Sequence, residues 1–522
     1  MTPSRRCHAV SASAPSSSTS SPQHAHPPTL TRRNTVSTEA QHAPTRRARA
    51  ELPLKRTLGT TSIVFMVIAG AAPLTVVAGI VPLILLVGNG IGAPADYLFA
   101  GAILILFAVG FTTMSHHIKN GGAFYAYIQK GLGRVGGLSA AALALVTYLL
   151  LLVAVFAYFG EASSNVVQTF TGADVPWWLF TAGGLLLIAF LGHRNVEMSA
   201  RVLGILLVAE LAIVAIVDFA IIFSGGDNGL RADPFFPENV FSANLGTGVM
   251  FAIFGFIGFE ATAAFRSEAK DPDRTIPRAT YIAVSIIALF YAFSSWAAIV
   301  GLGVDKAVDA ATADPVNLIT DLGTRYAGAF VHDAMQVLLA TSFFACVLTF
   351  HNVVSRYLFT LGRFGALPQS IAAVHPKYSS PYRASAITAA FTGVLLLVFT
   401  LPGLDPVVEI YTWLSGAATL GLIVLMAATS LAVLVFFGRQ GRLGFSVWRT
   451  RVAPALALAG LLTALVLVLA NFEFLIGSAW LAGVFVVVLA LAIAGGAAWA
   501  LTLRARRPDV YAQLTEEEDA AA

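Results

Sequence analysis

Twelve apolar segments of spanning length follow one another along the chain after residue 58. A transmembrane helix needs about 20 such residues to cross a hydrocarbon layer of roughly 30 Å, and in hydrocarbon a helix satisfies its own backbone hydrogen bonds. With 57% hydrophobic and 11% charged residues, the pattern excludes a soluble globular protein and predicts an all-α polytopic membrane protein. The twelve expected transmembrane helices lie at residues 59–86, 95–115, 137–162, 176–193, 199–223, 245–266, 279–302, 331–360, 384–402, 406–437, 452–471 and 477–503.

Lysine and arginine are distributed unevenly between alternate loops. Cytoplasmic loops carry the excess of these residues, and with the N-terminus inside, 29 of the 32 fall on the cytoplasmic side. The exceptions are Arg231, Lys306 and Arg325. We therefore expect a multi-pass protein of the cytoplasmic (inner) membrane with both termini in the cytoplasm. Because topology accounts for the net charge of +4, no nucleic-acid partner is expected.

The first and sixth apolar segments are interrupted near the middle of the bilayer. In MVIAGAAPLTVVAGIVP, Gly70 lies about eleven residues into the span, or roughly 16 Å at 1.5 Å per residue. In FAIFGFIGFEATAAF, Phe254 to Gly258 lie at a similar depth. Matched interruptions in two halves are typical of secondary transporters with inverted repeats. The alternative is that these glycines only allow close helix packing.

Interrupted helices offer binding groups without charged side chains. A half-helix begins with unpaired N–H groups at a positive dipole end and finishes with unpaired C=O groups at a negative end. Opposed in a dry pocket, such ends can hold the carboxylate and the ammonium of a zwitterion. We therefore expect a small-molecule substrate, such as an amino acid, to bind at the two breaks.

Three stretches resemble sequences of the amino acid–polyamine–organocation (APC) superfamily of permeases. FGFIGFEATAAFRSEAKDPDRTIPRA resembles the sixth-span signature of that family, GGAFYAYIQKGLGRVGG the loop before its third span, and NVVSRYLFTLGRFGALPQSIAAVHPKYSSPYRA the loop after its eighth. The resemblance implies a 5+5 inverted repeat of the leucine-transporter type, with two additional C-terminal helices and alternating access.

Composition and the same resemblance together divide the chain into four expected parts. Residues 1–57, rich in Ser, Pro, Thr, His and Arg, are expected to form a disordered cytoplasmic tail. Residues 58–437 form the expected ten-helix transport core, and residues 438–503 the two additional transmembrane helices. Residues 504–522 form the expected cytoplasmic C-terminal tail.

The resemblance places the substrate site at both breaks. Family members usually have Gly-Ser/Ala-Gly at the first break, whereas this chain lacks the third glycine. By similarity, amides at the first break receive the substrate carboxylate, carbonyls at both breaks receive the ammonium, and an aromatic of the sixth span closes over the substrate. The residues implied are Gly70, the amides of Ala71 and Ala72, the carbonyls of Ile68, Phe254 and Ile257, the Phe254 ring, and Gly258.

Three further residues have two interpretations each. Glu260 is the acid of the family's GFE motif, and it serves either a gate or a structural hydrogen bond. Tyr411 is either part of a tenth-span gate or an interfacial anchor. For His351, in the eighth segment, we favour a helix–helix hydrogen bond over a proton relay.

Two segments indicate which ion drives transport. In TSFFACVL, Ser342 has a hydroxyl group, but Ala345 and Cys346, one helical turn later, have none. This segment therefore provides few oxygen ligands for sodium. Some proton-coupled relatives place a lysine in the fifth span, and the matching residue here is Glu210. Because an ionised carboxylate at mid-depth is costly, Glu210 either takes up a coupling proton or is hydrogen-bonded between helices. Asp218, eight residues further on, is expected at the outer interface.

These observations predict a secondary active transporter that moves amino acids by alternating access, proton-coupled or as an exchanger. The alternative substrate is a polyamine or another organic amine, and the alternative class is a substrate sensor on a transporter fold. No phosphate-binding G-x-x-x-x-G-K-[ST] motif occurs, which argues against a primary pump. No catalytic constellation or metal-ligand spacing is found, so neither enzyme activity nor a metal or cofactor is expected.

Overall fold

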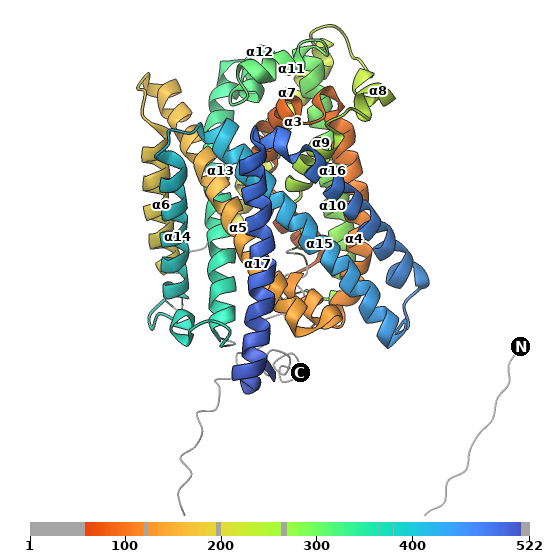
Figure 1. Ribbon diagram of the computed structural model, residues 1–522. Coiled ribbons are helices and arrows are strands. Elements are labelled where there is room, and N and C mark those ends of the chain that lie inside the picture. Colours follow the sequence, from red (N-terminus) through yellow and green to blue (C-terminus); the bar gives the residue numbers. More distant parts are fainter. Residues whose placement is uncertain are drawn as a thin grey trace, which may run out of the picture. The chain divides into compact units, whose positions relative to one another are not determined.

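A computed structural model describes residues 58–118, 124–194, 200–260, 262, 269–363, 365–378 and 380–512. Within these ranges the chain is almost entirely helical (Figure 1). Ten helical segments are long and apolar enough to cross a membrane, and two apolar helices, α6 (Trp177–His193) and α9 (Leu245–Phe254), are shorter. This confirms an all-helical polytopic architecture for the described part of the chain, whereas the count of twelve spans stays a prediction. The predicted N-terminal tail and residues 513–522 lie outside the described residues.

The long helices begin and end close to the predicted boundaries, apart from the first and sixth segments and the longer α5. The first segment forms three short helices, and α5 extends beyond its predicted span through a kink at Gly133, where φ is 86°. The helices are α1 Thr60–Gly70, α2 Pro73–Gly79, α3 Val81–Val87, α4 Ala93–Ser115, α5 Phe124–Thr171, α6 Trp177–His193, α7 Ala200–Ser224, α8 Pro237–Val240, α9 Leu245–Phe254, α10 Pro272–Leu302, α11 Ala307–Ala313, α12 Leu318–Ala327, α13 Ala329–Arg363, α14 Tyr382–Thr400, α15 Thr412–Gln440, α16 Ala453–Ile476 and α17 Ala479–Arg506.

The predicted break in the first segment is confirmed, and it lies directly after Gly70. Ala72 adopts a left-handed conformation with φ 45° and ψ 74°, and Pro73 begins α2. Proline has no N–H and its ring clashes with the preceding helical turn, so α1 cannot continue through it. It is well placed at the first position of a new helix, where no N–H is required.

The predicted break in the sixth segment is also confirmed. Helix α9 ends at Phe254, turns follow to Gly258, and Gly258 has a φ of 108°. Glycine adopts such positive φ values at little cost because it has no Cβ. The predicted continuation to residue 266 lies mostly outside the described residues.

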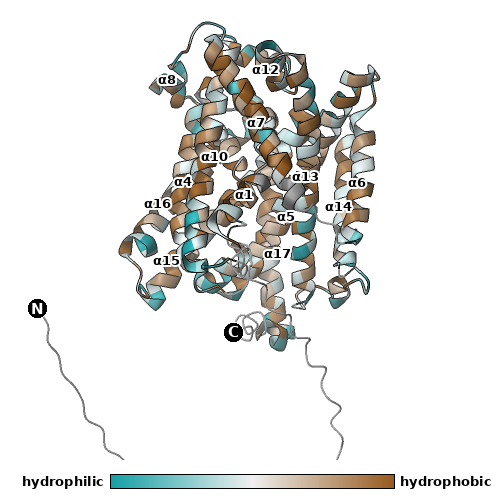
Figure 2. Ribbon diagram, turned by 180° about the vertical axis from the view of Figure 1, so that it is seen from behind, coloured by the Kyte–Doolittle hydropathy of each residue, from teal (hydrophilic) through white to brown (hydrophobic). Residues whose placement is uncertain are grey.

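The long helices pack around the broken segment. Helix α5 packs against α15, α13 and α17, and α10 packs against α4. Helices α6 and α14 lie side by side, as both views show (Figures 1 and 2). The short helix α2 is buried along its whole length, so the first break lies inside the protein.

Large apolar side chains face outward along the long helices. Leu186 of α6 is 73% exposed, Phe223 of α7 85% and Val466 of α16 65%. Figure 2 shows hydrophobic colour along much of these helices and hydrophilic colour mainly at their ends and in the loops. Soluble proteins rarely expose apolar surface on this scale, whereas lipid accepts it. The chain is therefore a multi-pass membrane protein.

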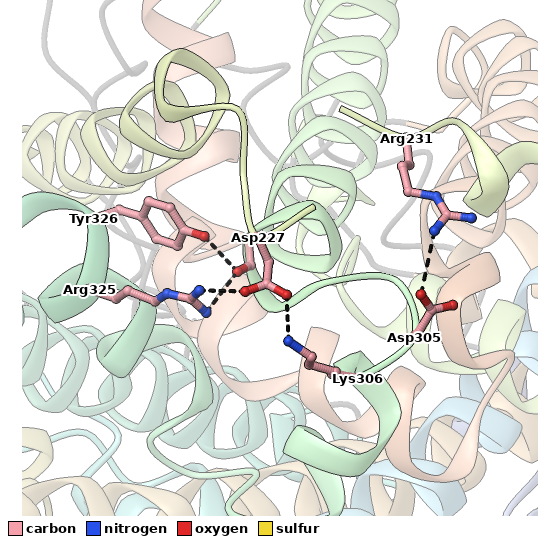
Figure 3. Close-up of polar contacts among 7 residues, drawn as sticks. Asp227, Arg231, Asp305, Lys306, Arg325 and Tyr326 are labelled. Atoms are coloured by element: carbon pink, nitrogen blue, oxygen red, sulfur yellow. Dashed lines mark hydrogen bonds and ion pairs between the residues drawn. The ribbon is translucent and has the colours of Figure 1, made fainter. Parts of the chain in front are cut away.

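Ion pairs join the loops at the end of the molecule where α11 and α12 lie (Figure 3). The carboxylate of Asp227 accepts hydrogen bonds from Lys306 Nζ at 2.8 Å and from Arg325 Nη2 at 2.6 Å. Arg231 pairs with Asp233 and, at 3.4 Å, with Asp305. The three basic residues that depart from the charge distribution of the sequence therefore all have acidic partners.

Candidate functional site

The first break is held by backbone and tyrosine contacts. The Ala71 N–H donates to the carbonyls of Val67 and Ile68, both at 3.1 Å. The hydroxyl of Tyr291, on α10, donates to the Ala71 carbonyl at 3.3 Å. Ile68, Ala71 and Ala72 are buried. In this conformation the Ala71 amide and the Ile68 carbonyl, both predicted to bind substrate, are hydrogen-bonded to each other.

Glu210 caps the half-helix that follows this break. Its Oε2 accepts a long hydrogen bond of 3.4 Å from the N–H of Leu74, the first amide of α2 after Pro73. On the next residue of α2, the Thr75 hydroxyl donates to Ser342 Oγ of α13 at 2.8 Å. Glu210 is only 4% exposed. A polar network thus links α7, α2 and α13 at the positive end of α2.

The second break is closed by Glu260. The Gly258 N–H donates to Glu260 Oε2 at 2.9 Å, and the Tyr148 hydroxyl of α5 donates to Oε1 at 2.8 Å. The Ile257 N–H donates to the Phe254 carbonyl at 3.0 Å. Glu260 therefore makes the structural hydrogen bonds that one interpretation predicted, and it ties the second break to α5.

An aromatic cluster lies beside the second break and the C-terminal end of α2. The Tyr411 ring meets the rings of Tyr158, Phe254 and Phe343 edge-on, with centroids 4.9, 6.0 and 6.4 Å apart. Tyr411 is fully buried, so interfacial anchoring is wrong for this residue. Its hydroxyl has no hydrogen-bond partner within the described part of the chain. Such an unpaired buried hydroxyl favours a nearby ligand or water.

The second break lies against α2, the half-helix that follows the first break. A Cβ added to Gly255 would lie 2.9 Å from Val76 Cγ1 on α2. The Tyr158 hydroxyl donates to the Ala78 carbonyl at 3.3 Å, which ties the last turn of α2 to α5. The predicted residues at the two breaks therefore converge on α2, with Tyr411 beside them.

Sequence reasoning missed Tyr158 and Tyr291. Both lie within long apolar helices and are fully buried, and both hydroxyls donate to backbone carbonyls of the broken segment. The available signal was a tyrosine at mid-depth in a span, because a buried phenol needs a hydrogen-bond partner.

Two further polar residues singled out in the sequence are His351 and Asp218. His351 Nε2 lies 2.9 Å from Ser385 Oγ on α14, which confirms the predicted helix–helix hydrogen bond. Asp218, which was expected at the outer interface, is covered by protein: it is 4% exposed and accepts a 2.6 Å hydrogen bond from Ser294. The reason is that α12 packs across α7 and lengthens the buried part of that helix. Over the described residues, no group of three His, Cys, Asp or Glu could hold a metal ion.

Comparison with known protein families shows to which family the chain belongs. A sequence model described as amino acid permease matches residues 57–476, most of the chain. The chain belongs to the amino acid permease family. This family lies within the APC superfamily, and the relatives that this chain matches are transporters of amino acids and of putrescine. The family is thus one of transporters rather than enzymes.

Individual relatives are distant and carry different substrates in their names. The permease is 22% identical over 347 residues to a low-affinity putrescine importer of Escherichia coli (strain K12), a match covering 64% of this chain and 72% of the relative. It is 26% identical over 303 residues to a branched-chain amino acid permease of Bacillus subtilis (strain 168), covering 57% and 59%. It is 26% identical over 344 residues to the chloroplastic cationic amino acid transporter 7 of Arabidopsis thaliana, covering 61% and 56%.

Proposed function

We propose that this permease is a secondary active transporter that moves amino acids across the cytoplasmic membrane by alternating access. The observation that carries the proposal is the contact between two interrupted helices, with Val76 of α2 against Gly255 at the end of α9. Opposed half-helix ends provide the partial charges that a zwitterion requires. The proposal includes a 5+5 inverted repeat over residues 58–437, with α16 and α17 as additional helices.

We orient the transporter with both termini in the cytoplasm, which places α11 and α12 on the outer side. The charge distribution of the loops supports this orientation. The three basic residues left on the outer side are all neutralised by aspartates. They therefore present little uncompensated positive charge on that side.

Glu210 is the residue that we propose takes up the coupling proton. It touches the first amide of α2, so ionisation changes the interaction with the positive end of that half-helix. Protonation weakens this attraction and frees α2 to change position. The proton thereby acts on the same element that forms the substrate site.

The test is uptake by proteoliposomes against an imposed pH gradient with sodium absent. Wild type is expected to accumulate radiolabelled substrate, and Glu210→Gln is expected to lose accumulation while keeping substrate exchange. Glu473→Gln, on the exposed face of α16, is the matched control and should behave as wild type. Equal accumulation by wild type and Glu210→Gln would eliminate Glu210 as the proton carrier. No uptake or exchange by the wild type in a panel of amino acids and amines would favour a sensor.

A second candidate substrate, a polyamine or related amine, is favoured by one observation. The Leu74 amide at the N-terminus of α2, a natural partner for a substrate carboxylate, is already bonded to Glu210. A fixed carboxylate in the site suits a cation that lacks a carboxylate of its own. The similarity to a putrescine importer points the same way.

A thermal-shift panel of amino acids and amines on the purified protein separates the two substrates. Stabilisation by zwitterions supports amino acid transport. Stabilisation by putrescine but by no amino acid would show that the amino acid assignment is wrong.

A further inference from the structure

A small cavity lies beside the buried carboxyl group of Asp218. Asp218 of α7 and Ser294 of α10 provide its polar wall, and the cavity volume is about 10 Å³, close to the space that one water molecule needs. Val77 of α2 and Leu322 of α12 contribute to the apolar wall. The cavity therefore lies where the half-helix α2 meets the segment that covers α7.

The surroundings of Asp218 disfavour a negative charge. Its described hydrogen-bond partner is the Ser294 hydroxyl at 2.6 Å, and none of the described residues that line the cavity is a lysine or an arginine. An ionised carboxylate without a cation in such a place is costly. In this conformation, burial thus favours the neutral, proton-bearing acid.

The nearest charged groups on α12 and α7 have other partners. On α12, Arg325 binds Asp227, and Asp321 faces His332 of α13 at 3.9 Å. Glu210, on α7 itself, binds Leu74. Helix α1 and helix α2 contain no ionisable side chain.

Helix α12 covers this site with an apolar face that includes Ile319 and Leu322, and an ion pair adds to its attachment. It packs on α7, α13 and α2, and Asp227 holds it through Arg325. Movement of α12 away from α7 would expose Asp218 to water, where its ionised form is stable. Closing α12 over Asp218 would again require a proton on the carboxyl group.

We propose that Asp218 is a proton-binding site that links closure of α12 to the outer pH. A proton from the outer solution binds the Asp218 carboxylate as α12 closes, and it returns to the outer solution when α12 opens. This proton is distinct from the one carried by Glu210. The inference rests on the proposed alternating access and on the orientation that places α12 outside.

The test is hydrogen–deuterium exchange of peptides covering residues 307–327, measured on the full-length protein in nanodiscs from about pH 5 to about pH 8. After correction for intrinsic amide chemistry, exchange in wild type is expected to increase with pH. One proton sets the upper limit, about tenfold in the opening equilibrium per pH unit. Asp218→Asn, which is neutral at every pH, should keep low exchange throughout.

Three variants act as controls. Asp321→Asn and His332→Gln remove the other titratable pair near α12 and should keep the pH dependence. The second is needed because imidazoles titrate in this range. Ser294→Ala removes the donor that stabilises the ionised carboxylate, so the plateau of exchange should move to higher pH, a result that mere loss of packing would not produce.

Several outcomes would overturn the inference. One is an Asp218→Asn protein with the same pH-dependent exchange as wild type. Another is loss of the dependence in Asp321→Asn or His332→Gln. If Asp218→Asn does not fold, the inference is overturned when Ser294→Ala reaches its plateau of deuterium exchange at the same pH as wild type. The deuterium exchange is measured without substrate. A failure of transport in proteoliposomes therefore contradicts the proposed function but does not decide whether Asp218 binds a proton.

Discussion

Substitution of Gly258 tests whether the second break positions substrate or only allows packing. Gly258 has a φ of 108°, a conformation that side chains with a Cβ rarely adopt. Its N–H donates to Glu260 at 2.9 Å, so a change in its backbone also releases Glu260. Gly258→Ala adds one carbon and Gly258→Leu a bulky chain, and both leave the apolar character of the segment intact.

The expected effect follows from the backbone strain. Holding a residue with a Cβ in a sparsely populated region of φ/ψ costs about 1–3 kcal/mol. At about 1.4 kcal/mol per factor of ten, substrate affinity should fall roughly 5- to 140-fold if binding requires this backbone. Gly258→Leu should lose binding altogether, while membrane insertion survives.

The measurement is equilibrium substrate binding by purified protein, with expression and monodispersity checked first. Gly133→Ala is the matched control: it also has a positive φ, 86°, lies in the kink of α5, and has open space around its added Cβ. It should lose stability to a similar degree and keep its affinity. Wild-type affinity in Gly258→Ala, or normal uptake by Gly258→Leu, would refute the reasoning and leave packing as the role of this glycine.

Two further perturbations test the attachment of α12 and the packing of α5. Hydrogen bonds from Lys306 and Arg325 hold the pKa of the Asp227 carboxyl below its ordinary value. These ion pairs therefore stabilise the attachment of α12 above about pH 4, and the stabilisation is lost as the pH falls through the lowered pKa. Asp227→Asn should therefore raise deuterium uptake of residues 318–327 already at neutral pH, and unchanged uptake would contradict the ion pair's role. A Cβ on Gly131 would lie 2.3 Å from the Ala432 carbonyl oxygen, so Gly131→Ala should cost about 1–3 kcal/mol and lower the Tm in detergent. Gly438→Ala, with open space around its Cβ, should not lower it, and equal Tm values for both variants would count against close α5–α15 packing.

The sequence predicted the breaks because their causes are local. Pro73 removes a backbone donor wherever its neighbours lie, and the glycines of the sixth segment permit backbone angles that end a helix. The apolar length of each span is likewise a local property. The structure therefore has both predicted breaks, with α1 ending at Gly70 and α9 at Phe254.

The contacts of the site could not be predicted, because they join residues far apart in the chain. Glu210 and Leu74 are separated by 136 positions, and counting residues along a helix gives depth but not neighbours. Tyrosine is a residue type that often anchors helices at the membrane interface, but three aromatic rings surround Tyr411. Asp218 was expected at the outer interface from its place along the fifth segment, and that place does not reveal that α12, a ten-residue helix in a loop, covers it.

The two-ended attachment of α2 has a consequence for how distant mutations act. Its first amide is bonded to Glu210 on α7 and its Ala78 carbonyl to Tyr158 on α5. A seven-residue helix is too short to absorb a shift within itself, so displacement of α5 relative to α7 must turn or translate it. By thermodynamic reciprocity, a ligand that favours one position of α2 also favours one spacing of α5 and α7. The Tyr158 hydroxyl can therefore change ligand affinity without touching the ligand.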